Sequence, residues 1–219
     1  MSFILNLETA TKNCSVALAK DGETIACKEI AAQNFSHAEK LHVFIEEILI
    51  ENKIQFMDLK AIAVSQGPGS YTGLRIGVSS AKGLCYALNI PLIAIDTLQL
   101  LAKQIKIEDG IIVPMIDARR MEVFSAFYDK NHQQIRKTEA EIINENSYAE
   151  LQEKIHLVGD GIEKLKNTLT NEKFLFYDYI IFPSANEMSE LSYNKFQTND
   201  FVNVAYFEPF YLKDFVLNK

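Results

Sequence analysis

A glycine-rich segment, Gly67-Pro68-Gly69-Ser70-Tyr71-Thr72-Gly73, lies between an expected buried strand at 61–66 and an expected helix at 72–88. Glycines permit a tight turn, and the start of a helix presents free N–H groups that can bind an anion. The segment is not a P-loop, because no Gly-Lys-Ser/Thr follows at the required spacing. It is not the dinucleotide fingerprint either, because Thr72 stands where the third glycine would be. These residues leave anion binding and a purely structural turn equally open.

Small residues recur along the expected helix at Gly73, Gly77 and Ala81. A spacing of four places them on one side of a helix, where another backbone can approach closely. A glycine inside a helix costs about 1 kcal/mol relative to alanine, so close packing is expected to offset that cost. The pattern leaves two alternatives: this side packs on the chain's own sheet, or it contacts a helix of a partner protein.

Two acids, Glu8 and Asp117, stand at the ends of equivalent expected strands, 3–8 and 111–116. Carboxylates can hold a metal ion or water, so one interpretation places a Mg²⁺–nucleotide between the two halves of the chain. The other is that each acid hydrogen-bonds only within its own hairpin. The run Asp117-Ala118-Arg119-Arg120 is expected to form an exposed hairpin turn.

The histidines do not show the spacing of a metal site. Five residues along a helix turn through about 500°, which leaves His37 and His42 about 140° apart. Metalloprotease helices place two histidines four residues apart with a glutamate between them, and His132 and His156 have no cluster of ligands around them. No serine lies in a G-x-S-x-G motif. The sequence therefore predicts neither metal ligands nor catalytic residues.

The expected elements occur in the same order twice: strand, strand, strand, helix, strand, helix, strand, helix. The turn Asp109-Gly110 divides the repeats. We therefore expect an α/β chain with two mixed-sheet halves facing one another, residues 1–109 and 110–219. Capping boxes, Ser36 with Glu39 and Ser184 with Glu187, are expected to begin two of the helices. The expected strands are 3–8, 14–19, 23–30, 61–66, 91–95, 111–116, 122–128, 134–143, 156–158 and 174–179, and the expected helices are 36–52, 72–88, 97–106, 147–154, 161–169 and 184–196.

The chain has 219 residues, with 22 Lys+Arg against 29 Asp+Glu and a net charge of −7. A hydrophobic content of 48% excludes a disordered, collagen-like or coiled-coil chain. No run approaches the ~20 apolar residues that span a bilayer, so no membrane contact is expected. The three cysteines form no C-x-x-C, which indicates a reduced, cytoplasmic protein. The acidic balance argues against a protein that holds nucleic acid by itself.

The glycine-rich segment, continued to Gly77, closely resembles the signature of the TsaB (YeaZ-like) family. Four further segments resemble the same family: Ile4–Thr11, Ser36–Glu39, Asp117–Arg120 and Pro209–Leu212. The resemblance runs through nearly the whole chain. It implies the duplicated actin/Hsp70/sugar-kinase fold, which is ribonuclease H-like in each half and agrees with the doubled order of elements.

The resemblance also implies a role in making threonylcarbamoyladenosine beside the anticodon of tRNAs that read codons starting with A. Members are expected to be non-catalytic scaffolds for the catalytic subunit TsaD, with the ATPase TsaE joining the assembly. On this basis the chain is expected to contact tRNA only as part of the complex. In the absence of its partners the chain could form a homodimer. Family contacts with TsaD use the helices of the N-terminal half, which makes the small-residue side the preferred interface. We expect partner contacts at Gly73, Arg75, Gly77, Ala81, Leu84, His37 and Leu41.

The resemblance gives no firm cofactor, although ATP with Mg²⁺ could act through the complex. The family usually has Asp where this chain has Glu8. The competing hypothesis is an ATP-dependent phosphotransferase or ATPase of the same fold. An anion or nucleotide would then bind at Glu8, Thr9, Thr11, Gly67, Gly69, Ser70 and Thr72.

Overall fold

Two five-stranded sheets with the same strand order form the framework of the computed structural model, which describes residues 1–31 and 37–212. In the first sheet, β3-β2-β1-β4-β5, β1 is antiparallel to β2 and parallel to β4. In the second, β8-β7-β6-β9-β10, β6 is antiparallel to β7 and parallel to β9. An antiparallel meander followed by two parallel strands thus occurs twice, which confirms the duplicated α/β fold. The strands are β1 (Phe3–Glu8), β2 (Asn13–Lys20), β3 (Glu23–Ala31), β4 (Leu59–Gly67), β5 (Leu92–Asp96), β6 (Ile111–Asp117), β7 (Glu122–Tyr128), β8 (Gln134–Ile142), β9 (Ile155–Val158) and β10 (Phe174–Phe176).

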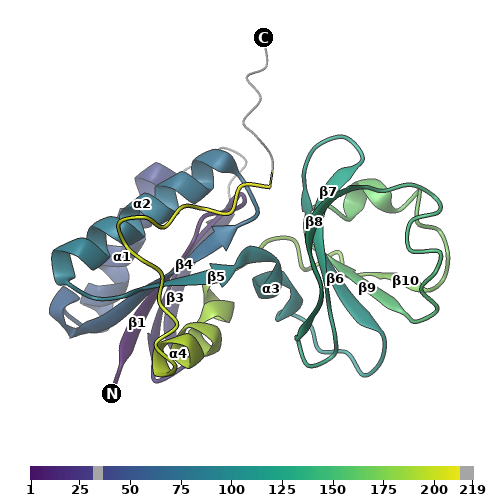
Figure 1. Cartoon of the computed structure of the whole chain (residues 1–219). Helices are drawn as coiled ribbons and strands as arrows, with labels where there is room; N and C mark the ends of the chain where they lie inside the picture. Colours follow the sequence, from purple (N-terminus) through teal and green to yellow (C-terminus); the bar gives the residue numbers. More distant parts are fainter. Residues whose placement is uncertain (32–36, 213–219) are drawn as a thin grey trace, which may run out of the picture. The chain divides into compact units, whose positions relative to one another are not determined.

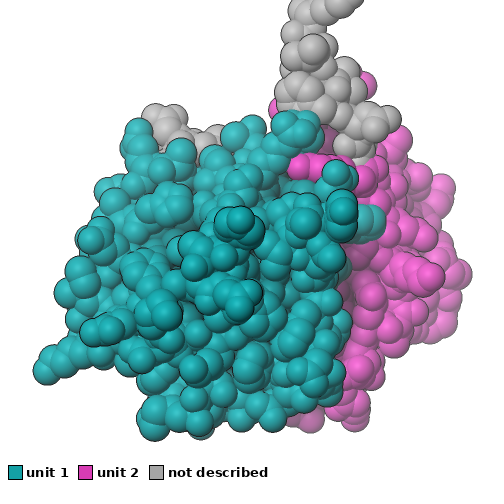
Figure 2. Space-filling model, turned by 60° about the vertical axis from the view of Figure 1, so that its left-hand side comes forward, with its two compact units in different colours: residues 1–97, 183–210 teal, residues 98–182, 211–219 magenta. Residues whose placement is uncertain are grey.

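The chain divides into two units, each built on one sheet. Unit 1 comprises residues 1–97 and 183–210, and unit 2 comprises residues 98–182 with the residues from 211 onward (Figure 2). These units differ from a division at residue 109, because the segment 183–210 returns to the sheet of unit 1. Asn13 Nδ2 donates to the Pro183 carbonyl at 3.0 Å, and the Ala185 N–H donates to Ser15 Oγ at 3.0 Å.

In unit 1 the helices α1 (His37–Glu51) and α2 (Tyr71–Leu88) cover one face of the sheet (Figure 1). Each helix presents apolar residues at intervals of three and four, the period that turns one face inward. Because side chains alternate across a strand, Leu5 and Leu7 of β1 share this core. The core also contains Leu41, Ile45, Ile48, Leu49, Val78, Ala81 and Cys85.

The opposite face of the same sheet is covered by the returning segment. It forms the 3-10 helix η3 (Ala185–Met188) followed by α4 (Ser189–Gln197). The Asn6 amide of β1 lies on this face, where Nδ2 donates to Ser189 Oγ at 3.4 Å. Ser184 caps η3 by accepting from the Asn186 N–H at 3.1 Å. The expected continuous helix at 184–196 is therefore a 3-10 turn leading into an α-helix. The Ser36 half of the other expected capping box lies outside the described residues.

Unit 2 keeps the sheet but lacks the two helices expected at 147–154 and 161–169, so those two predictions are wrong. The first stretch consists of turns, and the second contains only the 3-10 helix η2 (Glu163–Leu165). Ser147 Oγ accepts from the Asn144 N–H at 2.9 Å, and Asn144 Oδ1 accepts from the Asn146 N–H at 2.9 Å. Short polar side chains that bond nearby backbone compete with helix formation. In the stretch 144–147 these local bonds form in place of the start of the expected helix.

Two further helical elements differ from expectation. The helix α3 (Thr97–Ala102) ends before the expected residue 106, and a 3-10 helix η1 (Phe56–Asp58) precedes β4. Leu98, Leu101 and Ala102 of α3 pack on the second sheet with Phe124 and Tyr128. No helix within the described ranges, 1–31 and 37–212, is long and apolar enough to cross a membrane.

Candidate functional site: the first turn and the start of α2

The turn between β1 and β2 is held by the start of α2. Thr9 Oγ1 donates to the Gly73 carbonyl at 2.7 Å, and the Ser70 N–H donates to the Ala10 carbonyl at 2.6 Å. Thr9 and Ala10 are fully buried. The two most suggestive motifs of the sequence, the opening turn and the glycine-rich segment, are therefore brought together by direct contacts between them.

Glycines in α2 and in the loop before it make room for this turn. A Cβ at Gly69 would lie 2.3 Å from the Ala10 carbonyl oxygen, and one at Gly73 would lie 2.1 Å from the Thr9 carbonyl oxygen. A Cβ at Gly77 would lie 2.3 Å from Thr9 Oγ1. The close approach that the small residues permit is thus made by the chain's own first turn. This is the own-sheet alternative, and Ala81 is likewise buried in the core of unit 1.

The loop before α2 is also fixed by internal bonds. Ser70 is the N-cap of α2, and its hydroxyl accepts from the Gly73 N–H at 3.3 Å. Gly67 has φ +114°, a conformation that favours glycine, and its N–H donates to Thr97 Oγ1 at 3.1 Å. Thr72 remains exposed on the first turn of the helix.

Glu8 lies in the interior of unit 1. Its carboxyl group is fully buried, and Oε1 accepts from the Ala10 N–H at 2.5 Å. Among the described residues, none bonds Oε2. Burial raises the pKa of Glu8 to about 7, against smaller lowering effects from the Ala10 N–H and the Ser65 hydroxyl. Glu8 is therefore a self-bonded acid at the end of its hairpin.

The hypothesis of ATP with Mg²⁺ at the first turn meets groups that already bond within unit 1. The Thr9 hydroxyl and the Ala10 carbonyl are engaged with α2, and Glu8 is buried. Within the described ranges no group of three or more His, Cys, Asp or Glu side chains could hold a metal ion. We derive no nucleotide or metal chemistry from these residues.

The equivalent turn of unit 2, between β6 and β7, is an exposed hairpin. Arg119 and Arg120 in this turn have left-handed φ values of 71° and 50°, and the turn is closed by the Ala118 N–H, which donates to the Glu122 carbonyl at 3.1 Å. Asp117 Oδ1 accepts from the Arg119 N–H at 2.9 Å and also from the Lys164 ammonium. Asp117 is thus paired within its own unit.

Most of the expected partner contacts are internal. His37 is 1% exposed, and its Nε2 donates to the Thr11 carbonyl at 2.8 Å. Leu41 is fully buried, and Leu84 is partly buried against the same core. Of the seven residues expected at an interface, Arg75 alone is exposed.

The outward side of α2 carries Arg75, which was among the expected partner contacts, together with residues that sequence reasoning did not assign to an interface. Tyr86 is 86% exposed, and a Cβ at Gly83 would meet no described atom within 4 Å. The Arg75 guanidinium lies 4.1 Å from the centre of the Tyr71 ring. Helical spacing from the exposed Arg75 could have identified this side. The exposed residues of α2, called here its outward side, are Thr72, Arg75, Ser79, Gly83, Tyr86 and Ala87.

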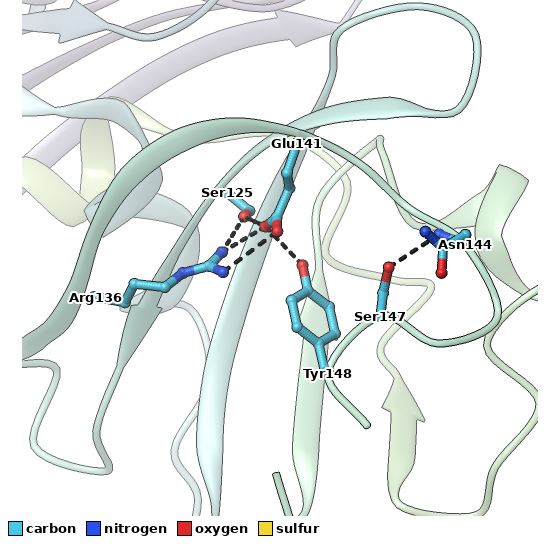
Figure 3. Close-up of polar contacts among 6 residues, drawn as sticks. All are labelled: Ser125, Arg136, Glu141, Asn144, Ser147 and Tyr148. Atoms are coloured by element: carbon cyan, nitrogen blue, oxygen red, sulfur yellow. Dashed lines mark hydrogen bonds and ion pairs between the residues drawn. The ribbon is translucent and has the colours of Figure 1, made fainter. Parts of the chain in front are cut away.

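A separate polar cluster lies in unit 2 (Figure 3). The Glu141 carboxylate accepts from the Tyr148 hydroxyl at 2.7 Å and also from Ser125 and Arg136. Arg136 lies 3.6 Å from the centre of the Phe127 ring. Burial alone would raise the pKa of Glu141, but these donors outweigh burial and hold it below its ordinary value. The cluster attaches the turns after β8 to the sheet.

Comparisons with known proteins decide the family. The family model for tRNA N6-adenosine threonylcarbamoyltransferase (TsaD) matches residues 28–214. The tRNA threonylcarbamoyladenosine biosynthesis protein TsaB of Escherichia coli (strain K12) is 31% identical, over 96% of this chain and 94% of its own. The chain belongs to the TsaB family. TsaB of Buchnera aphidicola subsp. Schizaphis graminum is 33% identical, over 84% of this chain and 90% of its own.

A solved structure of the same family confirms the architecture. YeaZ from Pseudomonas aeruginosa superposes with a TM-score of 0.82 at 25% identity, covering 97% of this chain and 100% of that one. The predicted TsaB-like resemblance and the actin/Hsp70/sugar-kinase-like fold are therefore both confirmed. The TsaB relatives are named as tRNA threonylcarbamoyladenosine biosynthesis proteins. This chain belongs to the same family of tRNA-modification proteins.

Proposed function

We propose that this TsaB-family chain is a non-catalytic accessory subunit for threonylcarbamoyl transfer to the adenosine beside the anticodon of tRNA. In this proposal a TsaD-like subunit carries out the transfer, and a TsaE-like ATPase joins the assembly. The observation that carries the proposal is the outward side of α2, which offers exposed contact residues on a rigid helix. This side replaces the buried small-residue side as the contact surface.

Gly83 is the most informative residue of that surface. It stands inside an 18-residue helix, where glycine costs about 1 kcal/mol relative to alanine. Unlike Gly73 and Gly77, it gains no close contact with the described part of the chain in return. A partner helix that approaches at Gly83 would supply the missing packing. Tyr86 and Arg75 beside it are of the residue types that dominate binding energy at protein interfaces.

The first turn supports an accessory rather than a catalytic role. Its hydroxyl, its carbonyl and its carboxylate all bond within unit 1, where they stabilise the junction of β1 with α2. Groups that act on a substrate must be free to reach it. The same turn therefore serves to hold α2 in place for a partner.

The charge of the chain supports contact with tRNA only through a partner. Binding to phosphate requires neutralising Lys and Arg side chains, and this chain carries a net charge of −7. A basic surface on the catalytic subunit would supply the electrostatic attraction. The accessory chain would then contribute stability and orientation to the complex.

Reconstituted threonylcarbamoyl transfer, with and without this chain, tests the proposal. The substitution Gly83→Arg places a long charged side chain on the outward side without a clash in the chain itself. We expect it to abolish co-purification with the TsaD-like subunit and to reduce transfer at least tenfold, while the melting temperature followed by circular dichroism does not fall. Gly83→Ala is the matched control and should retain both. Full transfer activity in the absence of this chain would refute the accessory role.

A further inference from the structure

The C-terminal part of unit 1 runs along α2 as a segment here called the strap (residues 202–210), which is drawn in yellow in Figure 1. Near its start, the Val202 N–H donates to the Leu92 carbonyl at 3.0 Å. At its end, the Phe210 N–H donates to the Gln66 carbonyl at 2.7 Å. The strap therefore joins the edge strand β5 to the glycine-rich loop that precedes α2.

Lys82 of α2 holds the middle of the strap. Its ammonium donates to the Ala205 carbonyl at 3.1 Å and to the Phe207 carbonyl at 3.0 Å. A charged donor makes stronger bonds to carbonyls than a neutral one. The two carbonyls flank Tyr206, so the lysine fixes the backbone on both sides of that residue.

The strap turns tightly around Tyr206. Asn203 Oδ1 accepts from the N–H groups of Ala205 and Tyr206, at 2.9 and 3.1 Å, and the Asn203 carbonyl accepts from the Phe207 N–H at 2.8 Å. Phe207 packs against the core of unit 1. Tyr206 itself is 85% exposed. A well-fixed backbone thus presents a tyrosine that makes little use of its apolar surface within the chain.

The place of Lys82 on α2 brings this tyrosine to the outward side. At about 100° per residue, Arg75, Lys82 and Tyr86 point within about 40° of one another. Lys82 and Tyr86 are one turn apart, and Tyr86 is 86% exposed. The strap held by Lys82 therefore borders the same side of α2 that carries Tyr86 and Arg75.

We propose that Lys82 is a positioning residue, which fixes Tyr206 beside Tyr86 so that both tyrosines contact the TsaD-like catalytic subunit. This inference rests on the proposed function and deepens it. Tyrosines supply large, rigid contact area at low entropic cost, and fixing a contact residue before binding removes an ordering cost. Lys82 acts through the strap and makes no contact with the partner.

The partner expected at this surface is the TsaD-like subunit, because its fold is related to that of this chain. The TsaD family model matches residues 28–214, so the catalytic subunit shares the architecture of this chain and has a helix equivalent to α2. Two chains of one fold can pair through equivalent elements about a pseudo-two-fold axis. Such pairing sets α2 against its counterpart, with the strap at the margin of the contact. A second copy of this chain is the alternative occupant, and the experiment distinguishes it.

Titration calorimetry of the full-length chain with the TsaD-like subunit tests the inference. Lys82→Met keeps the apolar stem and removes the ammonium, and Tyr206→Ala removes the anchor. We expect each to weaken binding about tenfold, as the loss of one pre-ordered contact residue predicts. The double variant should bind no more weakly than Tyr206→Ala, because Lys82 acts through Tyr206. Hydrogen exchange at residues 203–207 should accelerate in Lys82→Met. Lys60→Met and Tyr179→Ala, both at exposed positions elsewhere, are the matched controls.

The outcomes separate the inference from the proposed function. Unchanged affinity in Lys82→Met and Tyr206→Ala, with a wild-type chain that binds, overturns the inference and leaves the accessory role standing. The inference is also overturned if the variants weaken only self-association, measured by analytical ultracentrifugation. It fails as well if Lys82→Met still weakens binding tenfold in the Tyr206→Ala background. A wild-type chain that does not bind the TsaD-like subunit removes the accessory role and the inference together.

Discussion

The Tyr148 hydroxyl donates to the Glu141 carboxylate at 2.7 Å, and its ring meets Phe127 edge-on with centres 5.4 Å apart. Tyr148 is 5% exposed and adopts a left-handed φ of 62°. The Lys173 ammonium donates to the carbonyls of Tyr148 and Leu151, at 2.7 and 2.8 Å. One tyrosine thus anchors the turns that stand where unit 1 has the helix α1.

We expect Tyr148→Phe to destabilise the chain by about 1–2 kcal/mol, because it removes one hydrogen bond to a charged acceptor and keeps the ring contact. Tyr148→Ala should cost about 3–5 kcal/mol, because the ring contact is lost as well. Urea unfolding followed by circular dichroism measures both. Tyr179→Phe, at a position 77% exposed, should change the free energy of unfolding by less than about 0.5 kcal/mol. Equal stability of Tyr148→Phe and the wild type would show that the hydroxyl contributes nothing.

Glu8 makes stability fall as pH rises. Its pKa is raised from 4.5 to about 7 in the folded chain, so the folded state binds the proton more tightly than the unfolded state. Stability is therefore lost between about pH 4.5 and pH 7, by on the order of 3 kcal/mol, and stays lower above pH 7. The Gln in Glu8→Gln cannot ionise. We therefore expect the free energy of unfolding of this variant, relative to the wild type, to rise by about 3 kcal/mol between pH 4.5 and pH 8. Melting temperatures at the two pH values, with exposed Glu46→Gln as control, check this. A pH-independent difference would contradict a buried, proton-binding Glu8.

Glu141 acts in the opposite direction. Donors from Arg136, Ser125 and Tyr148 outweigh burial and hold the pKa of this carboxyl below 4.5. Its contribution to stability is therefore complete above the unfolded pKa, and is lost as pH falls through the lower folded pKa. We expect the wild type to lose its advantage over Glu141→Gln as pH falls below about 4.5. The crossing of the two acid-unfolding curves is the measurement. If the advantage grows instead as pH falls, the carboxylate is not stabilised by its donors.

Sequence reasoning recovered the strands of both units because each apolar run is short and bounded by turn residues, as from Phe3 to Glu8. It failed between 143 and 173, where Asn144 and Ser147 bond the local backbone in place of a helix. It identified the glycine-rich segment but not the turn of the same chain that the segment contacts. The turn at Thr9 lies more than sixty positions away, and only the fold brings it to Gly73.

The same limit explains why the sequence did not show which side of α2 is covered by the chain itself. Gly77 and Gly83 look alike in a sequence, since both are glycines inside one helical pattern. Their difference lies in what surrounds them: Thr9 Oγ1 for Gly77, and no described atom within 4 Å for Gly83. That distinction comes from a contact between distant parts of the chain, which a pattern along one helix cannot contain.

The isolated chain should bind tRNA poorly. Non-specific nucleic-acid binders have dissociation constants of roughly 10⁻⁴–10⁻⁶ M at physiological salt, and their affinity comes from released counterions. With a net charge of −7, this chain should fall outside that range. Filter binding at about 0.15 M salt tests this, and adding the TsaD-like subunit should restore retention. Tight, salt-dependent retention by the chain alone would show a basic surface that its composition does not indicate.

Alanine substitutions at the two glycines should separate the sides of α2. Gly83→Ala fills open space, so we expect it to stabilise the chain by up to about 1 kcal/mol. Gly77→Ala places a Cβ 2.3 Å from Thr9 Oγ1 and should destabilise it by about 1–3 kcal/mol. Because that atom belongs to a side chain, Thr9→Ala should recover part of the loss in the double variant. It should recover nothing for Gly73→Ala, where the clash is with the Thr9 carbonyl oxygen. Thermal melts of the set measure the pattern, and equal rescue at both positions would refute the arrangement of α2 on the first turn.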